Sequence, residues 1–408
     1  MKIKLTLKDL IKSLIFIILL INIFSGMLID INPIFKSLAT ISLIFELLAV
    51  LLFTVSHCRK IKLDCTTIIA VFFLCWSLLS FVVSTGGFYY LFERYRYILV
   101  GIILFWLVRE YISTEFITKV MDLLLVIQLI NAILTIYQNE ILGLHPDFCN
   151  GIFGTYDYFN SSQGILSLLI SCLSIIHYIY NTWNRKKCIL AIILSFIVCA
   201  FSEVKAFYII FIIDFLIITI LQINNKALMK KVIRIMIIAI LAFYIAWQIL
   251  SIVMPQNLQY FTNLQLYFAY EDYGARGGAG RINAFSYVYK NVFDSNFFSA
   301  LIGKGIGSAT GQYAYEFPLL FHEEGLIGVG LLIAFFISIM IDGLKYCKKS
   351  RIKPFGIFLI VWSVSIIISL FIWNAVFAKP MSLVFVFLGV GYIWKNNSIG
   401  KVREKNEY

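Results

Sequence analysis

Long uninterrupted apolar runs recur along almost the whole chain, and they constrain its fold more than any other feature. Runs of roughly 18 or more apolar residues are long enough to cross a bilayer as an α-helix. A transmembrane β-barrel would instead show short segments of alternating polarity. Hydrophobic residues occupy 61% of the 408 positions and charged residues only 14%. We therefore predict an all-α, polytopic integral membrane protein that forms a single transmembrane domain over residues 1–408.

Twelve segments of the sequence are predicted to be transmembrane helices. A break is placed near residue 203 because one unbroken helix from 187 to 223 would exceed about 50 Å at 1.5 Å per residue. The predicted spans are 10–30, 36–56, 66–85, 91–109, 118–138, 161–180, 187–203, 204–223, 231–253, 317–342, 355–374 and 379–395.

The positions of Lys and Arg predict the orientation. With the N-terminus in the cytoplasm, most basic residues fall on inner connections and on the C-terminal tail, as the positive-inside rule requires. Both termini are then cytoplasmic in a multi-pass protein of the cytoplasmic membrane. Topology and anionic lipid account for the net charge of +12, so we expect no nucleic-acid partner. Nine of the 34 basic residues lie on the outer side against the rule: Lys36, Arg94, Arg96, Lys205, Arg276, Arg281, Lys290, Lys304 and Lys379.

Two outer loops are long, one over about 139–160 and the other over about 254–316, whereas the other connections are short. A long loop in a compact chain is usually functional or disordered, and both loops are rich in Tyr and Phe. The larger loop contains RINAFSYVYKNVF, for which we predict an amphipathic helix lying at the membrane interface. Its apolar residues at helical spacing are Ile282, Phe285, Tyr289 and Val292.

The segment EDYGARGGAGRINAF, residues 271–285, combines four glycines with Arg276 and Arg281. Glycines let backbone N–H groups face a concavity, a helix start adds partial positive charge, and guanidinium forks suit phosphate oxygens. On the outer face the anion would be a lipid-linked phosphate or pyrophosphate. The alternative is a mobile loop whose arginines touch lipid headgroups.

The glycine-rich sequence LIGKGIGS, residues 301–308, is similar to a nucleotide-binding motif only superficially. It follows no soluble strand and it lacks the GKS/T register. We predict a loop with tight turns there.

Three more basic residues on the outer side are candidates for a site. Arg94 and Arg96 begin the fourth span and point in nearly opposite directions on a helix, so at most one faces a central cavity. Lys205 lies beside Glu203 at a turn, where an interfacial role and a functional role both remain open. Glu46 lies inside the second span and should face a polar partner rather than lipid.

The outer entrance of the tenth span, FPLLFHEEGLIGVG, carries several groups able to move a proton. Glu316, His322 and Glu323 are candidates for a general base, and headgroup contact is the alternative. Adjacent residues on a helix point about 100° apart, so His322 and Glu323 do not form a dyad automatically.

Three stretches make the chain resemble the O-antigen polymerase and ligase superfamily, most of all the Wzy-type repeat-unit polymerases. They are CNGIFGTYDYFNSSQGILSLL (149–169), FSEVKAFYIIFIIDF (201–215), and 280–332, which runs from GRINAF through GKGIG to EEGLIGVGLL. In the second stretch relatives typically have a Ser-Arg pair, whereas here the basic residue is Lys205. The layout of spans and two outer loops also fits this superfamily.

The resemblance implies an enzyme that joins polyprenyl-pyrophosphate-linked repeat units into O-antigen or capsular polysaccharide. Arg276 and Arg281 would hold the pyrophosphate, and Glu323 or His322 would act in catalysis. Arg94, Arg96, Lys205 and Glu316 would bind pyrophosphate or glycan, and loop aromatics would stack on sugars. No cofactor or metal is implied, since arginines can stabilise the leaving group. Membrane lipid, a flippase and a chain-length regulator are the expected partners.

One departure favours a polymerase over a ligase of the same superfamily. Ligases carry a His-Asn pair about eleven residues before the GLIG glycine, which here falls on Ala314 between Tyr313 and Tyr315. A lipid-linked glycan flippase is the alternative outside the enzymes, although we find no duplicated halves of the kind that transporters show.

Overall fold

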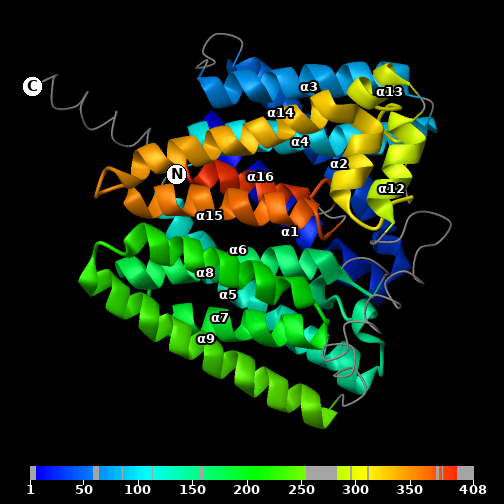
Figure 1. Ribbon diagram of the computed structural model, residues 1–408. Helices are drawn as coiled ribbons and strands as arrows, with labels where there is room; N and C mark the ends of the chain where they lie inside the picture. The colour runs from blue at the N-terminus through cyan, green and yellow to red at the C-terminus, as the bar shows by residue number, and fades with distance from the viewer. Residues whose placement is uncertain are drawn as a thin grey trace, which may run out of the picture.

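The computed structural model is built from α-helices and short 3₁₀ and π turns (Figure 1). It describes residues 6–57, 64–84, 86–112, 114–155, 160–253, 283–294, 296–309, 312–373, 376–378 and 380–392. The fourteen α-helices in this part of the chain are α1 (Leu7–Ile31), α2 (Leu38–His57), α3 (Cys65–Val83), α4 (Phe88–Tyr111), α5 (Thr114–Ile136), α6 (Asn160–Tyr180), α7 (Arg185–Phe201), α8 (Lys205–Gln222), α9 (Lys226–Val253), α12 (Ala284–Val288), α13 (Phe297–Ile302), α14 (Glu316–Cys347), α15 (Lys353–Leu370) and α16 (Met381–Val390). The short turns are η1 (Pro33–Ser37), η2 (Tyr137–Ile141), η3 (Pro146–Phe148), η4 (Gly151–Phe153) and η5 (Tyr289–Phe293).

Eight of the described helices are long and apolar enough to cross a membrane, by length and composition: α1, α2, α3, α5, α6, α8, α14 and α15. The other four predicted spans overlap α4, α7, α9 and α16, of which α16 is a shorter apolar helix of 10 residues in the described part of the chain. The predicted break near 203 is also present, since α7 ends at Phe201, α8 begins at Lys205 and Glu203 has a φ of 53°. The prediction of an all-helical, multi-pass membrane protein is confirmed to this extent.

The long helices run side by side, and the two ends of the bundle differ (Figure 1). We call the end that carries α12 and α13 the loop end. The opposite end is the basic end, where α1 begins and where the α8–α9 and α14–α15 turns lie. Lys226, Lys348 and Lys349 are at these turns.

The core lies where α6, α14, α15 and α16 meet their neighbours. α14 packs against α3 and α15, α4 packs against α16, and α6 packs against α7. Nearly all of α6 is buried, whereas much of α2 and α9 is exposed through apolar side chains such as Leu47, Leu51 and Ile240. These outer faces suit contact with lipid.

α14 is interrupted near its loop end by Gly325, whose φ of 65° and ψ of −168° are not helical. The interruption separates a short piece that begins at Glu316 from a long piece that ends at Cys347. A residue with a side chain would be strained at this positive φ. The short piece carries Glu316, His322 and Glu323.

Candidate functional site

A buried ion cluster joins α4 to the short piece of α14. Arg94 donates through Nη2 to Glu316 Oε1 at 2.5 Å and through Nε to Glu323 Oε2 at 3.2 Å. Arg94 is 7% exposed, Glu316 0% and Glu323 1%. The structure therefore brings together three of the residues predicted for the site, from segments more than 200 positions apart.

The remaining polar atoms of Arg94 and Glu323 bond mainly to the backbone. Arg94 Nη1 donates to the carbonyl oxygen of Phe377 at 3.3 Å, and Glu323 Oε1 accepts the N–H of Gly307 at 2.9 Å. Buried charges are tolerated only when they are paired and hydrogen-bonded. All three guanidinium nitrogens of Arg94 thus form hydrogen bonds within the protein. Arg94 therefore holds the Glu316 and Glu323 carboxylates in position.

The glycine loop 303–307 hydrogen-bonds to the end of the short piece of α14, just before the interruption at Gly325. Gly325 leaves carbonyl groups of the short piece without helical partners, and the N–H groups of Lys304 and Gly305 donate to the His322 and Glu323 carbonyls at 2.8 and 3.0 Å. Gly303, at a φ of +75°, lies so close that a Cβ would be 2.5 Å from the Glu323 carbonyl. The predicted tight turns therefore hold the helix end that carries the candidate base.

His322 forms a hydrogen-bonded pair with Tyr313. The phenol oxygen lies 2.8 Å from Nδ1, and both side chains are buried, with 5% of His322 and 4% of Tyr313 exposed. Burial, with smaller contributions from Tyr287 and Glu323, raises the pKa of the Tyr313 phenol, so this group stays protonated. In the tautomer in which Nδ1 donates to the phenol oxygen, Nε2 presents a lone pair. Tyr313 was missed by sequence reasoning, although it adjoins the position at which ligases have their His-Asn pair.

Glu324 adds a third carboxylate beside the cluster. It is 1% exposed, it accepts from Ser77 Oγ at 3.1 Å through Oε1, and its carbonyl oxygen accepts from Trp76 Nε1 at 3.0 Å. Within the described part of the chain, Glu316 Oε2 and Glu324 Oε2 are buried and have no hydrogen-bond partner. The short piece of α14 thus holds more carboxylate groups than Arg94 can pair.

Arg96 leaves α4 in a different direction from Arg94, as helical spacing requires. Its Nε lies 3.1 Å from Glu46 Oε2 of α2, and Glu46 is 1% exposed. Ser42 extends this polar chain, because its hydroxyl lies 3.0 Å from Glu46 Oε1 and 3.1 Å from Asn22 Oδ1. The expectation that Glu46 faces a polar partner is confirmed. Arg96 therefore contacts the polar chain of Glu46, Ser42 and Asn22 and is separate from the Arg94 cluster.

Lys205 is the first residue of α8 and is half-buried. Its N–H donates to the carbonyl oxygen of Glu203 at 2.8 Å. The bonds that assemble the Arg94 cluster come from α4, α14, loop 303–307 and Phe377, and Lys205 is not among these residues. Arg276 and Arg281 lie outside the residues that the structure describes.

Aromatic residues of the large loop cover the short piece of α14. The segment predicted to be an amphipathic helix is helical over α12 and η5, and its Val288 and Val292 belong to a buried cluster with Tyr313 and Leu319. Phe285 and Tyr289 remain 49% and 58% exposed. Protein therefore covers one apolar face of this helix, and aromatic rings remain at its surface.

The shorter loop inserts into the bundle at the loop end. Asn131 Oδ1 accepts the N–H of Ile152 at 3.1 Å, and Gln138 exchanges two hydrogen bonds with the backbone of Gly151. Burial, partly offset by a hydrogen bond from Asn139, raises the pKa of the Cys149 thiol to about 11. The part of the loop around Gly151 and Ile152 is thus fixed against the core, and Cys149 is a buried free thiol.

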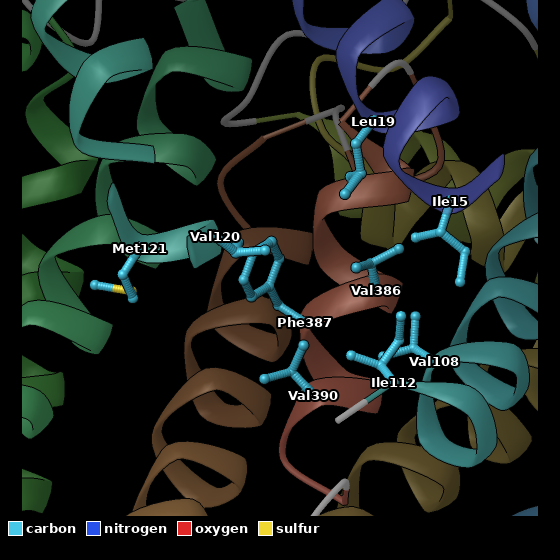
Figure 2. A pocket seen from close by; sticks show the side chains of 9 residues that line it. All are labelled: Ile15, Leu19, Val108, Ile112, Val120, Met121, Val386, Phe387 and Val390. Carbon is cyan, nitrogen blue, oxygen red and sulfur yellow. The ribbon is translucent and has the colours of Figure 1, made fainter. Parts of the chain in front are cut away.

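A small cavity lies far from these groups, between α1, α4, α5 and α16 (Figure 2). Its volume is about 20 Å³, and it is lined by apolar side chains such as Ile15, Val108, Val120 and Phe387. Val108 is fourteen residues along α4 from Arg94, or about 21 Å at 1.5 Å per residue. The cavity could hold about one water molecule, but none of its lining side chains is polar. It is therefore a small packing defect and not a binding site.

Among the described residues, no group of three or more His, Cys, Asp or Glu side chains is arranged to hold a metal ion. No protein-family model matches the chain, and no curated protein matches it. The functional assignment therefore depends on the chemistry of the residues themselves.

Proposed function

We propose that this chain is a glycosyltransferase acting on lipid-linked glycans at the outer face of the cytoplasmic membrane, most like a Wzy-type repeat-unit polymerase. The observation that carries the proposal is the convergence of Arg94, Glu316 and Glu323 with the His322–Tyr313 pair at the loop end of α14. Together these groups offer fixed charge, acceptors for sugar hydroxyls and a candidate base.

In this proposal α1 to α9 and α14 to α16 are twelve transmembrane helices, and the loop end faces outward. Both termini are then cytoplasmic. The lysines at the α8–α9 and α14–α15 turns support this orientation through the positive-inside rule. A site on the outer face would meet lipid-linked substrates and not sugar nucleotides.

The proposed reaction transfers a glycan from polyprenyl pyrophosphate to an acceptor sugar hydroxyl. The acceptor oxygen bonds to the anomeric carbon, the bond from that carbon to the pyrophosphate oxygen breaks, and the hydroxyl proton passes to Nε2 of His322. Arg276 and Arg281 are proposed to neutralise the departing pyrophosphate. Tyr313 acts as a positioning residue, because its bond to Nδ1 fixes the imidazole.

Glu316 and Glu323 are proposed to orient the acceptor glycan. Glu316 Oε2 has no hydrogen-bond partner among the described residues, so it can accept a sugar hydroxyl that reaches it. Exposed rings such as Phe285 and Tyr289 would stack on sugars. Arg94 positions the carboxylates, while Arg96 and Lys205 remain proposed contacts to pyrophosphate or glycan.

Reconstitution of the purified protein in liposomes tests the proposal. With a polyprenyl-pyrophosphate-linked repeat unit supplied on the loop-end side, wild type should give a ladder of products that grow by one repeat unit. Arg276→Ala and Arg281→Ala should insert normally and give no ladder, and Arg281→Lys should be impaired because Lys lacks the forked geometry. A normal ladder from both alanine variants would refute the pyrophosphate role. A single transfer to a different acceptor would identify a ligase.

The interruption of α14 favours a flippase as a second candidate. Discontinuous membrane helices that carry charged groups at the break are typical of transporters. A flippase would move the lipid-linked unit across the liposome membrane without changing its length. Movement without a ladder would therefore replace the enzyme proposal with this one.

A further inference from the structure

Four exposed aromatic side chains lie near the loop ends of α4 and α13, and the proposed reaction does not use them. We call this the aromatic patch and define it as Phe88 and Tyr89 of α4 with Phe297 and Phe298 of α13. Their exposures are 75%, 69%, 72% and 71%. Large aromatic side chains this exposed suit contact with lipid or with another molecule.

The patch continues a surface that already faces lipid. α3 is apolar enough to cross a membrane, and its last residues, Val82 and Val83, are 74% and 53% exposed. The loop that follows α13 contacts the loop end of α3, where Ser80 Oγ accepts the N–H of Ile306 at 3.1 Å. The patch is therefore at the edge of the bundle, where helices leave the hydrocarbon.

Close backbone packing fixes α13 to α4 through the glycine loop. A Cβ on Gly86 would be 2.6 Å from the Gly307 carbonyl oxygen, and one on Gly307 would be 2.6 Å from the Leu91 nitrogen. α13 ends at Ile302, immediately before this loop, and its Asn296 cap accepts the N–H of Ser299 at 2.7 Å. The two phenylalanines of α13 thus have a defined position relative to α4.

Phe88 and Tyr89 lie at the loop-end terminus of α4, beyond Arg94. Phe88 is six residues before Arg94, or about 9 Å nearer the end of α4. Aromatic residues concentrate at this level in membrane proteins, and cations beside them meet lipid phosphates. Lys290 is exposed and Lys304 is partly exposed in the neighbouring segments.

We propose that Phe297 and Phe298 insert into the headgroup–acyl boundary of the leaflet at the loop end, and that α13 is an interfacial anchor. The occupant of the patch is lipid. The anchor ties to the membrane the same glycine loop that bonds the His322 and Glu323 carbonyls. The helix over α12 and η5, by contrast, places Val288 and Val292 against protein.

Photocrosslinking tests the anchor without any assay of glycosyl transfer. Phe298 is replaced by benzoylphenylalanine, a similar aromatic residue, and the full-length protein in phospholipid nanodiscs is irradiated. The matched control carries the same residue at His145, a 46% exposed side chain of the shorter loop. The adduct mass distinguishes lipid from protein.

Phospholipid adducts should be several-fold more abundant at position 298 than at 145, and position 297 should repeat the result. Equal lipid adducts at 298 and 145, or crosslinks from 298 to protein alone, would overturn the anchor. Either outcome leaves the glycosyltransferase proposal untouched, because no substrate is present.

Discussion

Two of the three arginines of α4, Arg94 near the loop end and Arg109 near the basic end, are held in different ways. Arg94, at the loop end, is shared between Glu316 and Glu323, which are almost completely buried. Arg109, at the basic end, pairs with Asp64 and lies over the ring of Tyr392 at 4.7 Å. Fifteen residues separate them, or about 22 Å of helix.

The difference is one of charge balance and hydration. At the basic end one guanidinium meets one carboxylate whose side chain is 26% exposed. Asp64 also caps α3 by accepting the N–H of Thr67 at 3.0 Å, so this pair fastens two helix ends. At the loop end two buried carboxylates share one guanidinium, and Glu316 Oε2 has no bond among the described residues. The basic end is a structural clamp with one carboxylate for one guanidinium, whereas at the loop end two buried carboxylates share one guanidinium.

The matched substitutions Arg94→Ala and Arg109→Ala test this comparison with the largest expected effect. Arg94→Ala leaves two carboxylates buried without a cation, which should cost about 3–5 kcal/mol of folding free energy. Arg109→Ala should cost about 1 kcal/mol, because the partly hydrated Asp64 can meet water. Denaturant titration in one detergent measures both values, and equal losses would break the comparison.

The triple variant Arg94→Ala, Glu316→Gln, Glu323→Gln sharpens the same point. Removing the carboxylate charges together with the guanidinium should restore part of the stability that Arg94→Ala loses. A triple variant no more stable than Arg94→Ala would mean that Arg94 contributes through packing rather than charge.

His322→Gln separates chemistry from structure at the loop end. Loss of a general base should lower the rate of chain growth by about 10²–10⁴-fold, while folding stability changes little. Tyr313→Phe should lower the rate less and shift the pH–rate profile, because the imidazole loses the bond that orients it. Initial rates across pH measure both, and an unchanged profile for Tyr313→Phe would leave Tyr313 a packing residue only.

Gly303→Ala tests the loop that supports the short piece of α14. A Cβ would clash with the Glu323 carbonyl at a positive φ, which should cost about 1–3 kcal/mol. Gly330→Ala is the matched control, because a Cβ there meets no atom within 4 Å. Thermal unfolding compares the two variants. Equal melting temperatures would show that the loop can shift to accommodate the added methyl group without loss of stability.

Asp64→Asn should have the smallest effect, and that effect should depend on pH. Burial opposes ionisation, but the hydrogen bonds and charge of Arg109 lower the pKa of Asp64 from 3.8 to about 2. A depressed folded-state pKa contributes stability above the unfolded value, and this contribution is lost as pH falls toward 2. The stability difference between wild type and Asp64→Asn should stay constant from pH 7 to about 5 and shrink below about 4. A difference that vanishes near pH 6 would contradict the pairing.

Local patterns predicted much of the fold. Apolar runs located the eight described helices that are long and apolar enough to cross a membrane, length alone placed the break near residue 203, and the 100° turn per residue separated Arg94 from Arg96. These features depend on neighbours in sequence. The pairing of Arg94 with Glu323 spans 229 positions, and no local pattern specifies it.

The sequence predicted individual residues of the site but not how they are arranged. Glu316, His322 and Glu323 were recognised because they share one helix entrance, whereas Tyr313 was missed because its bond to His322 needs the turn before α14. The interfacial segment was expected over 281–292, and α13 is too short to show periodicity. The roles of Arg276 and Arg281 remain predictions.

The central claim is that the loop end of α14 carries out glycosyl transfer, and product length in liposomes tests it most directly. Wild-type protein and folded His322→Gln protein receive the same lipid-linked repeat unit, and products are separated by size. The account predicts a ladder from wild type and almost none from His322→Gln. Wild-type protein that gives no ladder, or a His322→Gln ladder equal to that of wild type, would contradict it.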